Sequence, residues 1–343
     1  MIRICAVALL VVGVASPCRA QDVAGYLALA REYAAGQGEE ATDRLAIWPQ
    51  SAVSAASAVA VTTGSVRDLL AAVMLHTDLA NATIDAEPEA ARFHLNIART
   101  VLTAASGRIG QRQRLEPFVR RWFRFVASVY TSAELLNAAA AIVHQGLEAF
   151  PTDPGLFVAR GTIIEVGVRK NFVPDWRRDT VFGTSHRDKV EDALNGAAGQ
   201  YVRALSLDSH NAEAHLHLGW VRLFMADGRA KSELDAAVAD AQDDGVRYLA
   251  HLFLGGLAER DNHLEDARHE YESARMVGPD FQTPYVALSR IEQALGHEDR
   301  ARELALAGLR LEKSDADDPW WDHRIGLDRQ GLYWLRDEVR RPQ

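Results

Sequence analysis

The sequence predicts an all-α protein built from pairs of antiparallel helices. Three observations support this fold class. Positions recur at a period of about 34 residues through the second half of the chain, small residues recur where two helices would approach closely, and large side chains recur where a gap between them needs filling. A recurring helical pair predicts an array that grows by stacking, so the 343 residues are expected to form one elongated array.

The clearest copy of the recurring pattern covers residues 248–281. Its marked positions are Leu254, Gly255, Ala267, Tyr271, Ala274 and Pro279. Tyr271 would fill the space between the two helices, and Pro279 would end the second helix. This pattern resembles the tetratricopeptide repeat. The resemblance implies a right-handed superhelical solenoid with a concave groove that binds a protein segment.

Residues 1–20 have the pattern of a secretory signal peptide. Arg3 precedes an apolar run over residues 4–15, and Cys18-Arg19-Ala20 supplies a small-x-small cleavage signature. The run is shorter than the roughly 20 apolar residues that span a bilayer. The alternative is a buried first helix. We expect export to the periplasm or the exterior of a bacterium, one with a GC-rich genome because only four of the 38 basic residues are lysine.

Cleavage would leave a chain without thiols and with more negative charge. Both cysteines, Cys5 and Cys18, lie in the leader, so disulfides and cysteine nucleophiles are not expected in the mature chain. Loss of Arg3 and Arg19 reduces the basic residues from 38 to 36 against 47 acidic ones, a net charge of −11. This balance disfavours nucleic acid as a partner. It also favours a solvated repeat face for the basic, aromatic-containing run over residues 108–124.

Residues 21–119 are expected to hold degenerate helical repeats. One pair is suggested by Tyr26, Tyr33, Ala41 and Leu45, and it ends at Pro49. A second pair is predicted over residues 66–81 and 89–105, interrupted by Glu87-Pro88.

Residues 120–315 are expected to hold five tetratricopeptide-like repeats. Their ranges are 120–153, 154–211, 212–247, 248–281 and 282–315. The second contains 24 residues more than the period allows, which predicts an insertion at about 168–189. Residues 316–343 are expected to form a C-terminal capping helix over the last apolar face, with a Trp-rich docking site as the alternative.

The resemblance places a partner-binding groove on the first helix of each pair. Its predicted residues are Arg121, Arg124, Glu165, Trp220, Leu223, Phe224, Arg260 and Arg290. Aromatic and arginine side chains dominate binding energy at interfaces, so the expected partner is a protein or peptide with apolar anchors and acidic groups. The alternative is that Trp220 and Phe224 only pack against neighbouring repeats or against the inserted segment.

The insertion carries a second set of candidate residues. These are Trp176, Arg177, Arg178 and His186. The insertion forms either an ordered lid that attracts an anionic ligand or a packed decoration.

No sequence motif indicates an enzyme, a cofactor or a metal site. His215 and His217 lie two apart on a predicted helix, so their side chains point in different directions and cannot share an ion. The expected function is a non-catalytic scaffold or assembly factor of the bacterial envelope. The alternative is a small-molecule-binding or hydrolytic site under residues 168–189.

Overall fold

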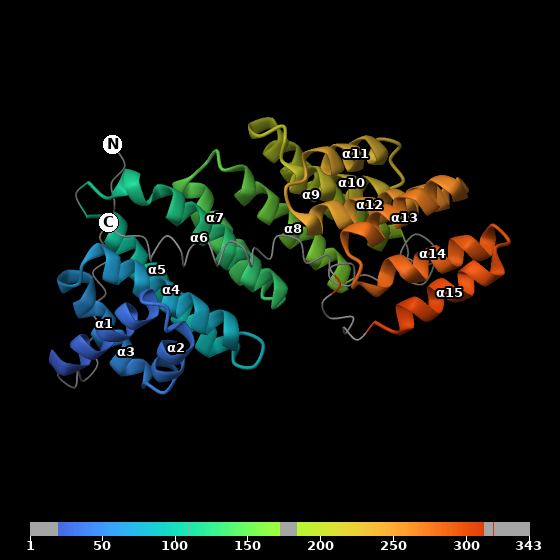
Figure 1. The fold of residues 1–343 in the computed structure, drawn as a ribbon. Coiled ribbons are helices and arrows are strands. Elements are labelled where there is room, and N and C mark those ends of the chain that lie inside the picture. The colour runs from blue at the N-terminus through green and yellow to red at the C-terminus, as the bar shows by residue number, and fades with distance from the viewer. Residues whose placement is uncertain (1–19, 109, 172–183, 312–317, 319–343) are drawn as a thin grey trace. The chain divides into compact units, whose positions relative to one another are not determined.

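The computed structural model describes residues 20–108, 110–171, 184–311 and 318. These residues contain fifteen α-helices and no strand, which confirms the all-α prediction (Figure 1). They belong to two compact units, and the division between them falls near residue 119, within α6. No helix among these residues has both the length and the apolar composition needed to cross a membrane.

The N-terminal unit is organised around one buried helix. Its helices are α1 (Ala20–Ala34), α2 (Gly38–Ala46), α3 (Gln50–Thr63), α4 (Val66–Thr83) and α5 (Pro88–Ser106). Every residue of α4 from Asp68 to Ala80 is buried, and α4 packs against α1, α2 and α5. Ser65 starts α4 through a capping box with Asp68, which satisfies backbone N–H groups at the helix start.

Helix α3 was not predicted from the sequence. The expected first pair ends with α2, and the chain then enters a further helix at Gln50, directly after Pro49. Proline at a helix start loses no hydrogen bond, because the first N–H groups of a helix have no partner within it. Pro49 therefore marks a helix beginning as well as the end of the preceding pair.

The C-terminal unit is a succession of helix pairs. It comprises α6 (Arg112–Ser132) from residue 120 onward, and then α7 (Leu136–Ala149), α8 (Pro154–Asn171), α9 (Thr184–Leu207), α10 (Ala212–Phe224), α11 (Ala230–Asp240), α12 (Asp244–Arg260), α13 (Leu264–Val277), α14 (Gln282–Ala294) and α15 (Glu298–Leu309). From α8 onward each pair packs internally and against the next pair along the chain. The predicted insertion partly lengthens its two flanking helices, since α8 continues to Asn171 and α9 begins at Thr184.

Glycines permit the close approach within the pairs. A Cβ on Gly255 would lie 2.5 Å from Cε1 of Tyr271, and one on Gly219 would lie 2.6 Å from Cδ2 of Leu234. Both distances are too short for non-bonded carbon atoms, so a Cβ at either position would have to displace the Tyr271 or Leu234 side chain. Tyr271 packs into the space beside Gly255, as the recurring pattern predicts.

Asp318 is the single described residue beyond Leu311. Its carboxylate is buried and accepts hydrogen bonds from the Tyr248 hydroxyl at 2.9 Å and from the Thr283 amide at 3.2 Å. It also accepts a bond from the Thr283 hydroxyl at 2.5 Å. Asp318 therefore caps the start of α14 and connects it to α12. The rest of the predicted C-terminal cap lies outside the described residues, as does the predicted signal peptide apart from Ala20.

Candidate protein-binding surface

Six of the described side chains define a candidate surface on the first helices of three successive pairs. This first-helix surface consists of Trp220, Leu223 and Phe224 on α10, Glu259 and Arg260 on α12, and Arg290 on α14. Contacts between neighbouring helices join them, because Arg260 reaches the Leu223 carbonyl and Arg290 reaches Glu259.

The aromatic part of this surface is a stacked pair at the end of α10. Trp220 and Phe224 are one helical turn apart, with ring centroids 5.4 Å apart and planes inclined by 23°. Trp220 is only 9% exposed, whereas Phe224 and Leu223 are partly exposed. Trp220 therefore packs against the inner side of Phe224, and the apolar area available to a partner comes from Phe224 and Leu223.

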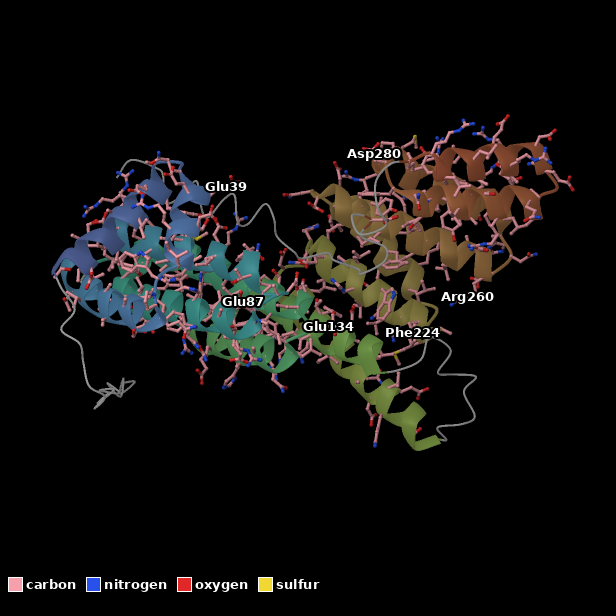
Figure 2. All side chains as sticks on the ribbon, turned by 90° about the horizontal axis from the view of Figure 1, so that it is seen from below. Glu39, Glu87, Glu134, Phe224, Arg260 and Asp280 are labelled. Carbon is pink, nitrogen blue, oxygen red and sulfur yellow. The ribbon has the colours of Figure 1, made fainter. Side chains whose placement is uncertain are left out.

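Arg260 lies at the corresponding end of α12 (Figure 2). Its Nε donates to Asp261 at 3.0 Å, and one terminal nitrogen donates to the Leu223 carbonyl at 3.5 Å. That carbonyl belongs to the last turn of α10 and also accepts a hydrogen bond from the Ala226 amide at 3.1 Å. Arg260 thus places a cation beside the C-terminus of the neighbouring helix, where the helix dipole favours positive charge.

Arg290 forms a two-bond ion pair with Glu259. Its Nε and one terminal nitrogen donate to the two carboxylate oxygens at 2.7 and 2.6 Å, and Tyr271 also donates to Glu259 at 2.9 Å. Burial alone would raise the pKa of Glu259, but the hydrogen bonds from Arg290 and Tyr271 and the Arg290 charge together lower it below its ordinary value. Glu259 is therefore ionised near neutral pH, and it balances the charge of Arg290.

Arg124 and Arg121 lie earlier in the chain, on α6. Arg124 donates from Nε and a terminal nitrogen to Asp153 at 2.8 and 2.6 Å, and Asp153 is fully buried in the turn before α8. Arg120 also donates to Asp153, at 3.3 Å. Arg121 is half-buried. Arg124 is thus engaged in connecting α6 to the start of α8.

Glu165 belongs to a buried network between α8, α9 and α10. It accepts a hydrogen bond from the Tyr201 hydroxyl at 2.6 Å and lies 3.1 Å from Nδ1 of His217. Tyr201 and His217 stack with centroids 5.3 Å apart, and all three side chains are at most 2% exposed. Burial, and then the Glu165 charge, raise the pKa of Tyr201 well above its ordinary value. The geometry assigns Glu165 to the interior, so a partner on the surface would not reach it.

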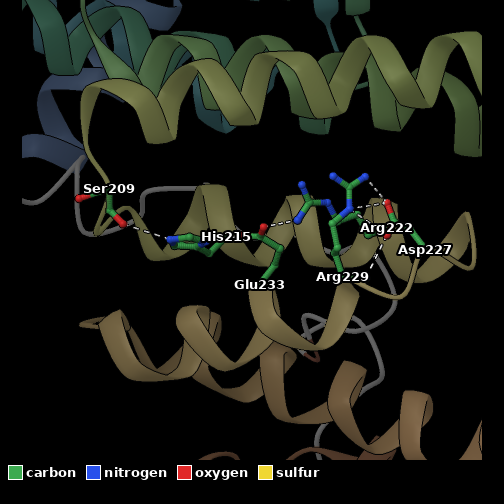
Figure 3. A network of polar contacts seen from close by, with 6 residues as sticks. All are labelled: Ser209, His215, Arg222, Asp227, Arg229 and Glu233. Atoms are coloured by element: carbon green, nitrogen blue, oxygen red, sulfur yellow. Dashed lines mark hydrogen bonds and ion pairs between the residues drawn. The ribbon is translucent and has the colours of Figure 1, made fainter.

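A second network joins α10 to α11 (Figure 3). His215 contacts Glu233 through Nδ1 at 2.6 Å and the Ser209 carbonyl through Nε2 at 3.1 Å, and Arg222 also binds Glu233. A carbonyl only accepts hydrogen bonds, so Nε2 of His215 carries a hydrogen. His215 and His217 point to different carboxylates, Glu233 and Glu165, on different helices.

The candidate residues of the predicted insertion have no described side chains. Trp176, Arg177 and Arg178 lie outside the described residues. His186 falls in the first turn of α9, and its side chain is not among those described.

No protein-family model and no curated protein matches the chain. Among solved structures, PilF of Pseudomonas aeruginosa is similar with a TM-score of 0.46 and 15% identity, over 64% of this chain and 89% of that one. PilW, described as a widely conserved type IV pilus biogenesis factor, has a TM-score of 0.44 and 19% identity over 64% and 92%. YrrB, described as a TPR protein with an unusual peptide-binding site, has a TM-score of 0.38 and 13% identity over 63% and 90%.

These similarities cover less than two thirds of this chain, and its helix pairs are established by its own packing instead. The recurring glycines, the tyrosine packed beside Gly255 and the succession of pairs from α8 to α15 make this part of the chain a tetratricopeptide-like repeat array.

Proposed function

We propose that this chain is a non-catalytic scaffold or assembly factor that holds a segment of a partner protein against the first-helix surface. The observation that carries the proposal is the placement of Leu223 and Phe224, partly exposed at the end of α10, beside the exposed Arg260, which reaches the Leu223 carbonyl. The exposed Arg290 extends this basic area, because it pairs with Glu259, the residue before Arg260. A partly exposed aromatic side chain next to arginines is the composition that contributes most to protein interfaces.

The partner would insert an apolar side chain beside Phe224. Val286 on α14 is 58% exposed and adds aliphatic area to the same series of first helices. A guanidinium group carries five N–H donors, and the pair with Glu259 uses two of those of Arg290. The remaining donors can bind carbonyl or carboxylate oxygens of a partner. Because Glu259 neutralises Arg290, this binding would depend more on hydrogen-bond geometry than on net charge.

The proposed site of action is the bacterial envelope. This part of the proposal rests on the leader-like pattern of residues 1–20. Secretion of a reporter fused to residues 1–20, compared with the same fusion carrying Leu9→Arg and Val12→Arg, tests it. Export of both fusions, or of neither, would remove the envelope from the proposal.

Site-specific crosslinking tests the surface. A photoreactive phenylalanine analogue at position 224 should capture one envelope protein, and the same analogue at Val202, an exposed apolar residue on α9, should not capture it. Leu223→Ser should weaken the capture at position 224 at least about tenfold, the effect of losing about 1.4 kcal/mol. Circular dichroism of each variant checks that it is folded. Equal capture from positions 224 and 202 would remove the first-helix surface from the proposal.

A further inference from the structure

Three buried side chains in the N-terminal unit form a hydrogen-bonded row. The hydroxyl of Tyr26 on α1 lies 3.0 Å from Nε2 of His76 on α4, and Nδ1 of His76 lies 2.9 Å from Nδ1 of His94 on α5. The two imidazoles stack with centroids 5.1 Å apart. Tyr26 and His76 are fully buried, and His94 is 8% exposed. This imidazole cluster of Tyr26, His76 and His94 joins three helices.

The two hydrogen bonds of the row limit how many protons its side chains can bind while both bonds stay formed. When both histidines are neutral, one hydrogen lies between the two Nδ1 atoms and one lies between Tyr26 and His76, so both hydrogen bonds form. One added proton still satisfies both bonds, because His76 can then donate at both of its nitrogens. A second added proton places two N–H groups against each other at 2.9 Å and two cations in a buried space.

The two buried carboxylates of α4 already have partners outside the imidazole cluster. On α4, Asp68 binds Arg31 at 3.0 and 3.1 Å, and Asp78 accepts a hydrogen bond from Tyr33 at 3.0 Å. Helix α3 contains no ionisable residue, and α2 carries its charges on exposed side chains. The other charged groups on α1, α2, α4 and α5 are Asp22, Glu32, Glu39, Glu40, Asp43, Arg44, Arg67, Glu89, Arg92 and Arg99.

We propose that the imidazole cluster is an acid-sensitive device that holds α1, α4 and α5 together near neutral pH and opens the N-terminal unit when both histidines take up protons. The cluster connects α4, the buried centre of the unit, to α1 and to α5. Breaking its hydrogen bonds therefore weakens the packing of the whole unit. The cluster is independent of the first-helix surface, which lies on α10, α12 and α14.

The direction of the pH effect follows from proton binding. Burial lowers the pKa of His94 to about 4, and burial together with the nearby His94 lowers the pKa of His76 well below its ordinary value. An unfolded histidine binds its proton near pH 6.5. The opened state therefore takes up more protons than the closed state as pH falls below about 6.5. Stability from the cluster is present above that pH and is lost as the pH falls toward 4.

Hydrogen exchange in the full chain, corrected for intrinsic exchange rates, tests the proposal. Between pH 7 and pH 5 the opening constant for amides of α4 should rise more than about 100-fold, since each extra proton contributes up to tenfold per pH unit. Amides of α12 and α13 serve as the internal reference and should change by less than about tenfold. The carboxylate pair of Asp68 with Arg31 titrates below this range, because Arg31 and Ser65 lower the pKa of Asp68 against the raising effect of burial.

His94→Gln removes one titrating group and retains a hydrogen-bonding side chain, so it should reduce the pH effect on α4 at least about fivefold. The matched control His269→Gln changes an exposed histidine of α13 and should leave the effect unchanged. If His94→Gln does not fold, NMR titration of the histidine ring signals in the wild-type chain decides. Equal pH responses of α4 and α12, or native-state titration of His76 and His94 near pH 6.5, would overturn the proposal.

Discussion

At the residue scale, close contacts between helices depend on the absence of a single methyl group. A Cβ on Gly161 of α8 would lie 2.4 Å from Cε1 of Tyr201. The hydroxyl of Tyr201 donates a hydrogen bond to the buried Glu165. Gly161→Ala must displace Tyr201 and disturb that hydrogen bond. We expect the free energy of unfolding to fall by about 1–3 kcal/mol, the range for overpacking a close contact. Urea unfolding followed by circular dichroism measures this change.

Gly199 on α9 is the matched control for Gly161→Ala. No atom lies within 4 Å of a Cβ built there, and the residue is exposed. Gly199→Ala should raise the free energy of unfolding by about 0.5–1 kcal/mol, because alanine favours a helix interior over glycine. A loss of stability at Gly199, or none at Gly161, would contradict the assignment of Gly161 to close helix packing.

The partners of the arginines could not be predicted from the sequence. The repeat pattern predicts which first-helix residues lie on one face, since that follows from helical periodicity. It gives no information on which carboxylate a guanidinium will meet, because Asp153 lies 29 residues after Arg124 and Glu259 lies 31 before Arg290. The network of Tyr26, His76 and His94 was missed for the same reason, with separations of 50 and 18 residues.

At the scale of elements, Asp153 connects α6 to α8. One of its oxygens accepts from the Leu156 amide at 3.0 Å at the start of α8, and both accept from Arg124. Asp153→Ala removes the helix cap, worth about 1 kcal/mol, and charged hydrogen bonds worth about 1–2 kcal/mol more. We expect a total loss of about 2–3 kcal/mol in urea unfolding, because both arginines still reach water.

Asp153→Asn separates the two contributions. Asparagine retains a cap acceptor and loses the charge, so the loss should be smaller than for alanine. Arg124→Ala should cost less again, since Arg120 remains beside Asp153. If Arg124→Ala left the free energy of unfolding unchanged, the contact with Asp153 would not stabilise the fold. Arg124 would then be available to bind a partner.

The sequence predicted elements best where small and large residues alternate between paired helices. Helices α12 and α13 are of this kind. Helix α3 was missed because its alanine, serine and valine residues show no charged face that would mark a helical period. The sequence predicted a helix here but not the central position of α4, because the burial of polar residues such as Asp68, His76 and Asp78 depends on partners on α1 and α5 that are distant in the sequence.

At the scale of the whole molecule, the two units are stabilised in different ways. The N-terminal unit packs around α4, so removing one neighbour exposes the centre of the unit. In the described part of the C-terminal unit, polar links lie within a pair or join successive pairs, as in the network of Glu259, Tyr271 and Arg290. Repeat arrays with nearest-neighbour contacts have stabilities that vary along the chain and decrease toward an end.

The contacts of Asp318 test this nearest-neighbour behaviour. Asp318→Ala leaves the buried hydroxyl of Tyr248 without its acceptor and removes the cap on Thr283. Burial and the Asp318 charge raise the pKa of Tyr248, so the hydroxyl stays protonated and needs an acceptor. Losing both contacts should cost about 1–2 kcal/mol, which corresponds to about 5- to 30-fold faster amide exchange in α12 and α14. Exchange in α8 and α9 should stay unchanged, because the effect of a lost contact in such an array ends with its neighbours. Equal acceleration from α8 to α15 would instead mean that these helices open as one cooperative body, and unchanged exchange in α14 would mean that Asp318 contributes nothing to holding the end of the array.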